Sequence, residues 1–148
     1  MKKILLIDDS DTYTWCLQKY LQQRGYPVKT ACTLKEARAA IQEEMPLVVC
    51  CNLDLPDGSG MDFLNEVRAA DKELPFILAS CHDKDDYEQE AMRRGATLCM
   101  DKMKGLYLLY GLVRGNGEDV NGQHEVPGEV GEVGDHAVLD VAGVVLEE

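Results

Sequence analysis

The fold is decided by residues 48–62, whose sequence is VVCCNLDLPDGSGMD. Apolar residues come first, a Pro/Gly/Asp turn follows, and a helical pattern begins at Gly60. A short continuous apolar run bounded by turn residues is typical of a strand that is buried on both faces. Asn52 is then the last strand residue, and its side chain points out of the carboxyl edge of a parallel sheet. Open α/β sheets carry their chemistry at that edge.

Strands and helices alternate on both sides of this stretch. The apolar runs predict strands at 2–7, 27–32, 47–52, 75–80 and 97–101. Between and after them, helical patterns run from just after a loop at 8–11 to Gly25, from 34 to 44, from 60 to 70, from 83 to 95 and from 104 to 114. Strict alternation predicts an α/β fold, a (βα)5 doubly wound five-stranded parallel sheet with helices on both faces.

Local signals sharpen several of these helices. Thr33 and Glu36 have the spacing of a capping box, and Asp83 is the expected cap of the fourth helix. Trp15 is expected to pack inward with the apolar face of the first helix. The inward face of the first helix is predicted to hold Tyr13, Cys16, Leu17, Tyr20 and Leu21. The inward face of the second is predicted to hold Leu34, Ala37 and Ile41, and that of the third Phe63, Leu64 and Val67.

Composition divides the chain in two. The formal net charge is −12, and residues 115–148 hold nine acidic and no basic side chains, which leaves a net charge of −3 for residues 1–114. We therefore expect a domain at 1–114, followed by an acidic Gly/Glu/Val-rich tail at 115–148 that is largely disordered. A nucleic-acid surface would need clustered Lys and Arg, so nucleic acid is not expected as a partner.

The cysteines and the N-terminus exclude other classes. The six cysteines form no CxxC pair and no zinc spacing, and several lie in apolar strand patterns where a free thiol acts as a small hydrophobe. A redox sensor is the disfavoured alternative. The apolar run at 4–7 is too short for a signal peptide, and no window reaches the length of a transmembrane helix. The predicted location is the cytoplasm, without membrane contact.

The turn after the third strand resembles the signature of the response-regulator receiver family, Asp-Leu-x-Leu-Pro-x-x-Ser/Thr-Gly. Every element is present in residues 52–60 except the first, where Asn52 stands in place of the phosphate-accepting aspartate. The Asp8-Asp9 pair and the Gly95-Ala96…Lys102 ending also match, so the resemblance covers residues 2 to about 114. It implies a flavodoxin-like strand order of 2-1-3-4-5.

In that order the carboxyl ends of the strands bring several polar side chains to one crevice. The resemblance implies that Ser80 and Lys102 contact a phosphoryl group and that residue 52 is the acceptor position. It also implies Mg²⁺ on Asp8 and Asp9, a set to which Asn52 and Asp54 can add oxygen ligands, because hard oxygens suit this cation. The implied partners are a histidine kinase or phosphotransfer protein and a downstream protein target, with a monomer or weak dimer as the expected assembly.

This chain departs from the family at three positions. A neutral carboxamide is no anionic nucleophile, so Asn52 is predicted to keep metal binding but not to accept phosphate. The aromatic residue that usually precedes the lysine by three positions is replaced by Cys99, and the proline that usually follows it by Met103. A non-proline cis bond is costly, so a trans bond is expected there. Because all three positions depart together, we favour a receiver that has naturally lost its phosphate-accepting aspartate. An engineered Asp→Asn change at residue 52 is the alternative.

Two alternatives use other carboxylates. Asp54 lies two residues past the acceptor position and is either a carboxylate that tunes the site or a surrogate acceptor. Asp9 and Asp11 follow the first strand as in haloacid-dehalogenase-type phosphohydrolases, which would make the chain an enzyme. The missing acidic pair after a later strand and the lack of room for a cap domain argue against that enzyme. His82 is expected to be a solvated loop residue.

Overall fold

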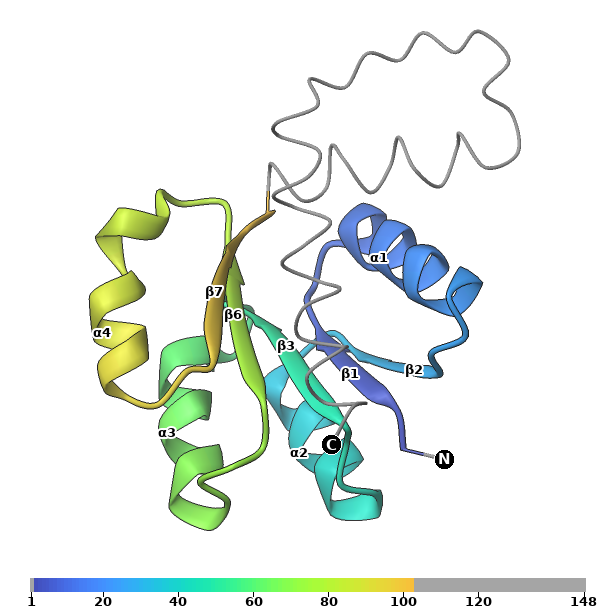
Figure 1. Cartoon of the computed structure of the whole chain (residues 1–148), viewed down its shortest axis with the longest axis horizontal. Helices are drawn as coiled ribbons and strands as arrows, with labels where there is room; N and C mark the ends of the chain where they lie inside the picture. Colours follow the sequence, from blue (N-terminus) through green and yellow to red (C-terminus); the bar gives the residue numbers. More distant parts are fainter. Residues whose placement is uncertain (1, 103–148) are drawn as a thin grey trace, which may run out of the picture.

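A five-stranded parallel sheet carries the fold of this computed structural model, which describes residues 2–102 (Figure 1). The strand order is β2-β1-β3-β6-β7, and each neighbouring pair is parallel. Numbered within this sheet alone, the order is the predicted 2-1-3-4-5, so the fold-class prediction is confirmed. The strands are β1 (Ile4–Ile7), β2 (Val28–Ala31), β3 (Val48–Asn52), β6 (Phe76–Ser80) and β7 (Leu98–Asp101).

Helices fill the connections, and one short hairpin follows β3. The hairpin pairs β4 (Asp54–Leu55) with β5 (Gly58–Ser59) in antiparallel fashion, where only a turn was expected. The predicted helix at 104–114, the peptide bond after Lys102 and the tail at 115–148 lie outside the described residues. Within residues 2–102 every helix is too short or too polar to span a bilayer. The helices are α1 (Asp11–Gln23), α2 (Leu34–Glu43), α3 (Gly60–Ala70), the 3₁₀ turn η1 (Lys84–Asp86) and α4 (Glu88–Arg93).

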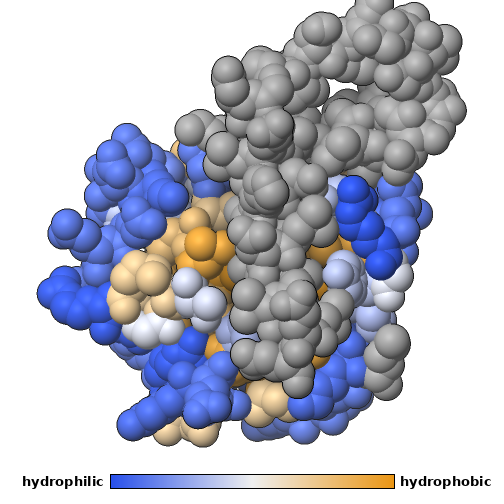
Figure 2. Space-filling model, in the orientation of Figure 1, coloured by the Kyte–Doolittle hydropathy of each residue, from blue (hydrophilic) through white to orange (hydrophobic). Residues whose placement is uncertain are grey.

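The sheet divides the core into two layers. Side chains of a strand alternate between its faces, so Leu5 and Ile7 pack beneath α2, α3 and α4, whereas Ile4 and Leu6 pack beneath α1. In Figure 2 hydrophilic residues cover the flanks over α4 and α1, and apolar residues come to the surface between them, along the sheet. Both faces of β1 are buried, as the unbroken apolar run predicted.

The first helix buries the residues that its spacing predicted. Tyr13, Cys16, Leu17, Tyr20 and Leu21 are all buried, and Gly25 follows the helix with a φ of 88°. The expectation for Trp15 was wrong, because its side chain lies on the outer face and is 48% exposed. Trp15 lies four residues before the exposed Lys19, and the two share the outer face of the helix.

Two caps differ from their predicted form. Thr33 Oγ1 accepts from the Glu36 amide at 3.1 Å, but the Glu36 carboxylate bonds the N–H of Cys32, at 2.8 Å, rather than that of Thr33. Asp83 caps η1 instead of α4, accepting from the Asp85 amide at 3.0 Å. The connection after β6 therefore begins with a 3₁₀ turn, and α4 is only six residues long.

The β4–β5 turn is anchored at the amino end of α2. Asp57 accepts hydrogen bonds from the backbone amides of Leu34, at 2.8 Å, and Lys35, at 3.1 Å. These are orphan donors of the first helical turn, and a carboxylate there also opposes the positive end of the helix dipole. The bond to Leu34, followed by that to Lys35, holds the pKa of Asp57 below its ordinary value.

Gly60 begins α3 in close contact with the end of β3. Its amide donates to the Leu53 carbonyl at 2.7 Å, and a Cβ at this position would meet the Asn52 carbonyl oxygen at 2.3 Å and the Leu78 side chain at 3.1 Å. No side chain fits without moving the strand end on which residue 52 lies.

Replacing Asp57 with Asn is expected to destabilise the chain at neutral pH and much less in acid. A carboxylate whose folded pKa is lowered adds stability above its unfolded pKa, and that stability is lost as the pH falls through the folded pKa. Urea unfolding of both proteins from pH 7 to about pH 3.5 should give a difference in unfolding free energy that shrinks toward low pH. A difference independent of pH would contradict the role given to the charge.

Gly60→Ala is expected to lower the free energy of unfolding by about 1–3 kcal/mol, because the added methyl overpacks the strand end. Asn65→Ala, on the exposed face of the same helix, is the control and should change it by less than about 0.5 kcal/mol. Urea denaturation followed by circular dichroism measures both, and equal effects would refute the steric argument.

Candidate functional site

The carboxyl edge of the sheet gathers most of the residues that the sequence singled out. Asn52 ends β3 opposite Ala79, and Ser80, the next residue, ends β6 opposite Asp101, so the two lie one residue apart in level across the sheet. Asp8 directly follows β1, and Lys102 directly follows β7. The fold thus brings these side chains to one crevice from four strands.

Asp8 and Lys102 form a buried ion pair at this edge. Asp8 Oδ2 lies 2.7 Å from Lys102 Nζ, close enough to pair although the angles are not those of a hydrogen bond. The two residues are only 5% and 6% exposed. Asp8 Oδ1 accepts from the Ser10 amide at 2.9 Å. Both oxygens of this carboxylate are therefore engaged.

Tyr13 lies against the same ammonium group. Lys102 Nζ is 4.5 Å from the centroid of the Tyr13 ring, within the range of a cation–π interaction. The ring is buried, and its hydroxyl has no hydrogen-bond partner among the described residues. Burial is the main cause that raises the pKa of Tyr13 well above its ordinary value, so the phenol stays neutral. The sequence predicted only packing here, and the spacing of residues on the helix carried no signal of Lys102.

Asn52 is bonded to its own turn. Its Nδ2 donates to the Asp54 carbonyl oxygen at 2.6 Å, and the side chain is half-buried. This hydrogen bond orients the amide within its own turn. An amide nitrogen that donates to a carbonyl offers no nucleophile, and the amide oxygen is neutral.

Ser80 lies at the end of β6, and His82 lies in the loop that follows it. Ser80 is 1% exposed, and its hydroxyl accepts from the His82 amide at 2.9 Å. His82 Nε2 lies 3.1 Å from Asp54 Oδ2, with the two side chains 63% and 70% exposed. His82 is a solvated loop residue, as predicted, but its pairing with Asp54 was not foreseen. The pair links the loop after β6 to β4.

The oxygen donors suit Mg²⁺ in kind, but they are not assembled as a cage. In the part of the chain that the structure describes, no three acidic, histidine or cysteine side chains are grouped to hold a metal ion. Asp9 is exposed and Asp54 pairs with His82, while Asp8 already shares an oxygen with Lys102. Asp9, Asp8 and the Asn52 oxygen are the ligands that a hydrated Mg²⁺ could use, since this ion retains several waters.

The cysteines behave as the sequence predicted. All six are free, and burial raises the pKa of Cys50 to about 12 and that of Cys99 to about 11. Such thiols stay protonated at neutral pH and react slowly. Cys32 and Cys81 are exposed, and burial, followed by Glu36, still raises the pKa of Cys32.

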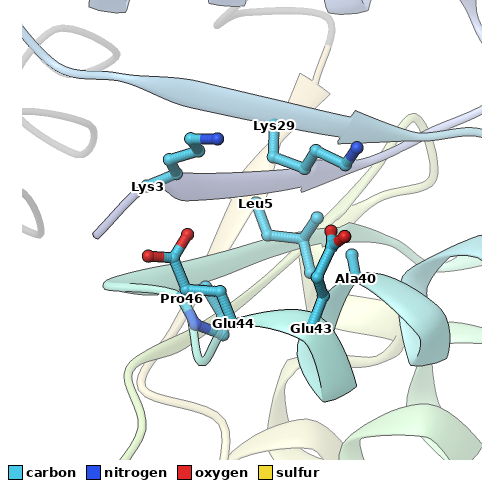
Figure 3. Close-up of a pocket in the computed structure, with 7 residues that line it drawn as sticks. All are labelled: Lys3, Leu5, Lys29, Ala40, Glu43, Glu44 and Pro46. Atoms are coloured by element: carbon cyan, nitrogen blue, oxygen red, sulfur yellow. The ribbon is translucent and has the colours of Figure 1, made fainter. Parts of the chain in front are cut away.

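A separate pocket lies away from this edge (Figure 3). It opens between α2 and the amino-terminal parts of β1 and β2, with a volume of about 50 Å³, far below the roughly 300–1,000 Å³ of ligand pockets. None of the predicted site residues lines it. Its lining consists of Lys3, Leu5, Lys29, Ala40, Glu43, Glu44 and Pro46.

Comparison with known proteins gives one family. The family described as "Response regulator receiver domain" matches residues 4–114. The regulatory protein LuxO of Vibrio vulnificus is 29% identical over 91 residues, which are 62% of this chain and 20% of LuxO. The transcriptional regulatory protein KdpE of Staphylococcus aureus is 32% identical over 100 residues, 68% of this chain and 43% of KdpE. The chain therefore matches less than half the length of either regulator.

Solved structures agree with this assignment. The chemotaxis protein CheY4 of Vibrio cholerae has a TM-score of 0.62 and 30% identity, over 67% of this chain and 84% of CheY4. The receiver domain of NtrX from Brucella abortus has a TM-score of 0.64 and 27% identity, over 75% of this chain and 97% of that domain. The phosphohydrolase alternative built on Asp9 and Asp11 finds no support in these relatives. With the strand order and the carboxyl-edge residues already in place, the chain belongs to the response regulator receiver domain family.

Proposed function

We propose that this chain is a receiver domain of a two-component or phosphorelay system that signals through protein contacts without phosphorylation at residue 52. The observation that carries the proposal is the amide of Asn52 at the acceptor position, bonded to the Asp54 carbonyl. In-line phosphoryl transfer needs an anionic nucleophile held in place, and an amide supplies none. On this proposal the chain is a signalling module and not an enzyme.

The packing behind β7 supports the proposal. Cys99 replaces the aromatic residue expected on this strand, and Tyr87, from the end of η1, packs in the same core layer. The Tyr87 hydroxyl donates to the Met100 carbonyl at 3.2 Å, and the side chain is 6% exposed. A buried, hydrogen-bonded ring is held in one position, whereas a reporter of phosphorylation must move between two.

The proposed partners of this chain are those that the receiver family implies. A histidine kinase or phosphotransfer protein is the upstream partner, and a downstream protein is the target. The acidic balance of the sequence, −12, disfavours direct contact with nucleic acid. A cytoplasmic location and a monomer or weak dimer complete the proposal.

Receiver domains typically bind Mg²⁺ at the acceptor site, and we propose weakened binding here. When bound, the ion would neutralise oxygens at the crevice. Asp9 would be its main ligand, with Asp8 and the Asn52 oxygen beside it. Asp8 shares its charge with Lys102, and Asn52 contributes no charge, so the attraction is smaller than with an aspartate at residue 52.

Incubation with Mg²⁺ and acetyl phosphate is expected to add no phosphoryl group to the unaltered chain. The Asn52→Asp variant should gain one, because Ser80 and Lys102 already stand at the same edge. Intact mass spectrometry followed by peptide mapping measures both. A phosphoryl adduct on residue 52 of the unaltered chain would refute the proposal.

The control variant Asp54→Asn distinguishes phosphorylation at residue 52 from phosphorylation at Asp54 as a surrogate acceptor. If the unaltered chain gains a phosphoryl group and the Asp54→Asn variant does not, Asp54 is the residue that accepts it. The Asp54 side chain is 70% exposed. The Asn52→Asp, Lys102→Met double variant should label more slowly than Asn52→Asp alone if the lysine assists transfer.

Mg²⁺ binding is expected to weaken in Asp9→Asn and to strengthen by about tenfold in Asn52→Asp, because each unit charge beside the ion is worth on the order of 1 kcal/mol or more even in water. Isothermal titration calorimetry gives the affinities. Asp62→Asn, an exposed carboxylate on α3, is the control and should leave them unchanged. Equal affinity in Asp9→Asn and the unaltered chain would exclude the proposed ligand.

A further inference from the structure

We infer that Tyr13 is a positioning residue for Lys102, and that its ring face holds the ammonium group on Asp8. The contact joins the first turns of α1 to the end of β7. Nothing in the receiver resemblance required an aromatic residue at this position.

The geometry is that of an ammonium with two attractive neighbours. Lys102 Nζ lies 2.7 Å from the Asp8 carboxylate and 4.5 Å from the centroid of the Tyr13 ring. All three residues are at least 94% buried. Solvent screening is weak in such a place, so the ring quadrupole attracts the cation more strongly than at an exposed site.

The ring, and not the hydroxyl, makes the contact. The Tyr13 hydroxyl is buried without a hydrogen-bond partner among residues 2–102, although a buried hydroxyl normally has one. A residue retained for its hydroxyl would be expected to use it. A phenylalanine at residue 13 should therefore hold Lys102 as well as tyrosine does, whereas an aliphatic side chain of similar size should not.

Holding the ammonium group in this way has a consequence for the crevice at the carboxyl edge, and this consequence rests on the proposed function. With the ammonium held by both Asp8 and Tyr13, the crevice has its cation in place without a phosphoryl group. The edge then keeps one arrangement, which suits a domain that presents a constant surface to its partner. The holding of Lys102 is itself a separate property and can be tested without any phosphodonor.

The test is the rate at which N-hydroxysuccinimide acetate acetylates Lys102 in the full chain at fixed pH, resolved by mass spectrometry with exposed Lys29 as internal reference. Tyr13→Leu should raise the Lys102 rate about tenfold relative to Lys29, while Tyr13→Phe should leave it unchanged. Tyr13→Met, a long side chain without a ring, serves as the second variant if Tyr13→Leu does not fold, and the same rise is expected.

The matched control is Tyr20→Leu, which removes another buried ring from α1, one that faces Arg24 at 4.0 Å. It should destabilise the helix and leave the Lys102 rate near that of the unaltered chain. The inference is overturned if Tyr13→Leu and Tyr13→Met leave Lys102 protected, if Tyr13→Phe exposes it, or if Tyr20→Leu exposes it equally. Any of these results leaves the proposal for Asn52 untouched, because no phosphorylation is measured.

Discussion

The buried ion pair between Asp8 and Lys102 constrains the whole carboxyl edge. β1 and β7 are three strand spacings apart, about 14 Å, so their side chains can meet only across the ends of β3 and β6. Removing two charges from water costs several kcal/mol each, and only close pairing offsets it. Loss of either partner would leave a charge buried alone, which typically costs about 3–5 kcal/mol. The pair thus spans the edge of the sheet at which Asn52 ends β3 and Ser80 ends β6.

The substitution at residue 52 fits this constraint electrostatically. An aspartate there would add a third carboxylate beside Asp8 and Asp9. Like charges in one crevice repel one another, and a bound cation is needed to offset that repulsion. The amide removes that demand and donates to the Asp54 carbonyl instead. One lysine then balances the one deeply buried carboxylate, since Asp9 is exposed to solvent. In the folded state of this receiver, the buried Asp8 carboxylate is accordingly neutralised by a side chain of the chain itself.

Sequence patterns predicted the helices and strands well where the burial of one face determines the spacing of apolar residues. The inward stripe of α1 and the span of α3 were confirmed because 3.6-residue periodicity reflects packing directly. The strand order came from the resemblance, since periodicity does not say which strands are neighbours. Side-chain partners were harder to predict: the spacing that placed Tyr13 inward could not show Lys102, 89 residues away along the chain. The His82–Asp54 pair and the Asp57 cap on α2 were missed for the same reason.

Ser80 and Lys102, the two predicted phosphoryl contacts, also have a structural role in this chain. Ser80 is buried at the end of β6 and accepts from the His82 amide, and Lys102 neutralises a buried carboxylate. Each would be costly to replace even if no phosphoryl group ever entered the crevice, because its removal leaves a buried group without a partner. Residue 52 is different: it is half-buried at the rim, and its amide satisfies itself within the turn. Of these three positions, residue 52 is therefore the one at which a substitution costs the folded state least, which fits the proposed loss of phosphate acceptance there.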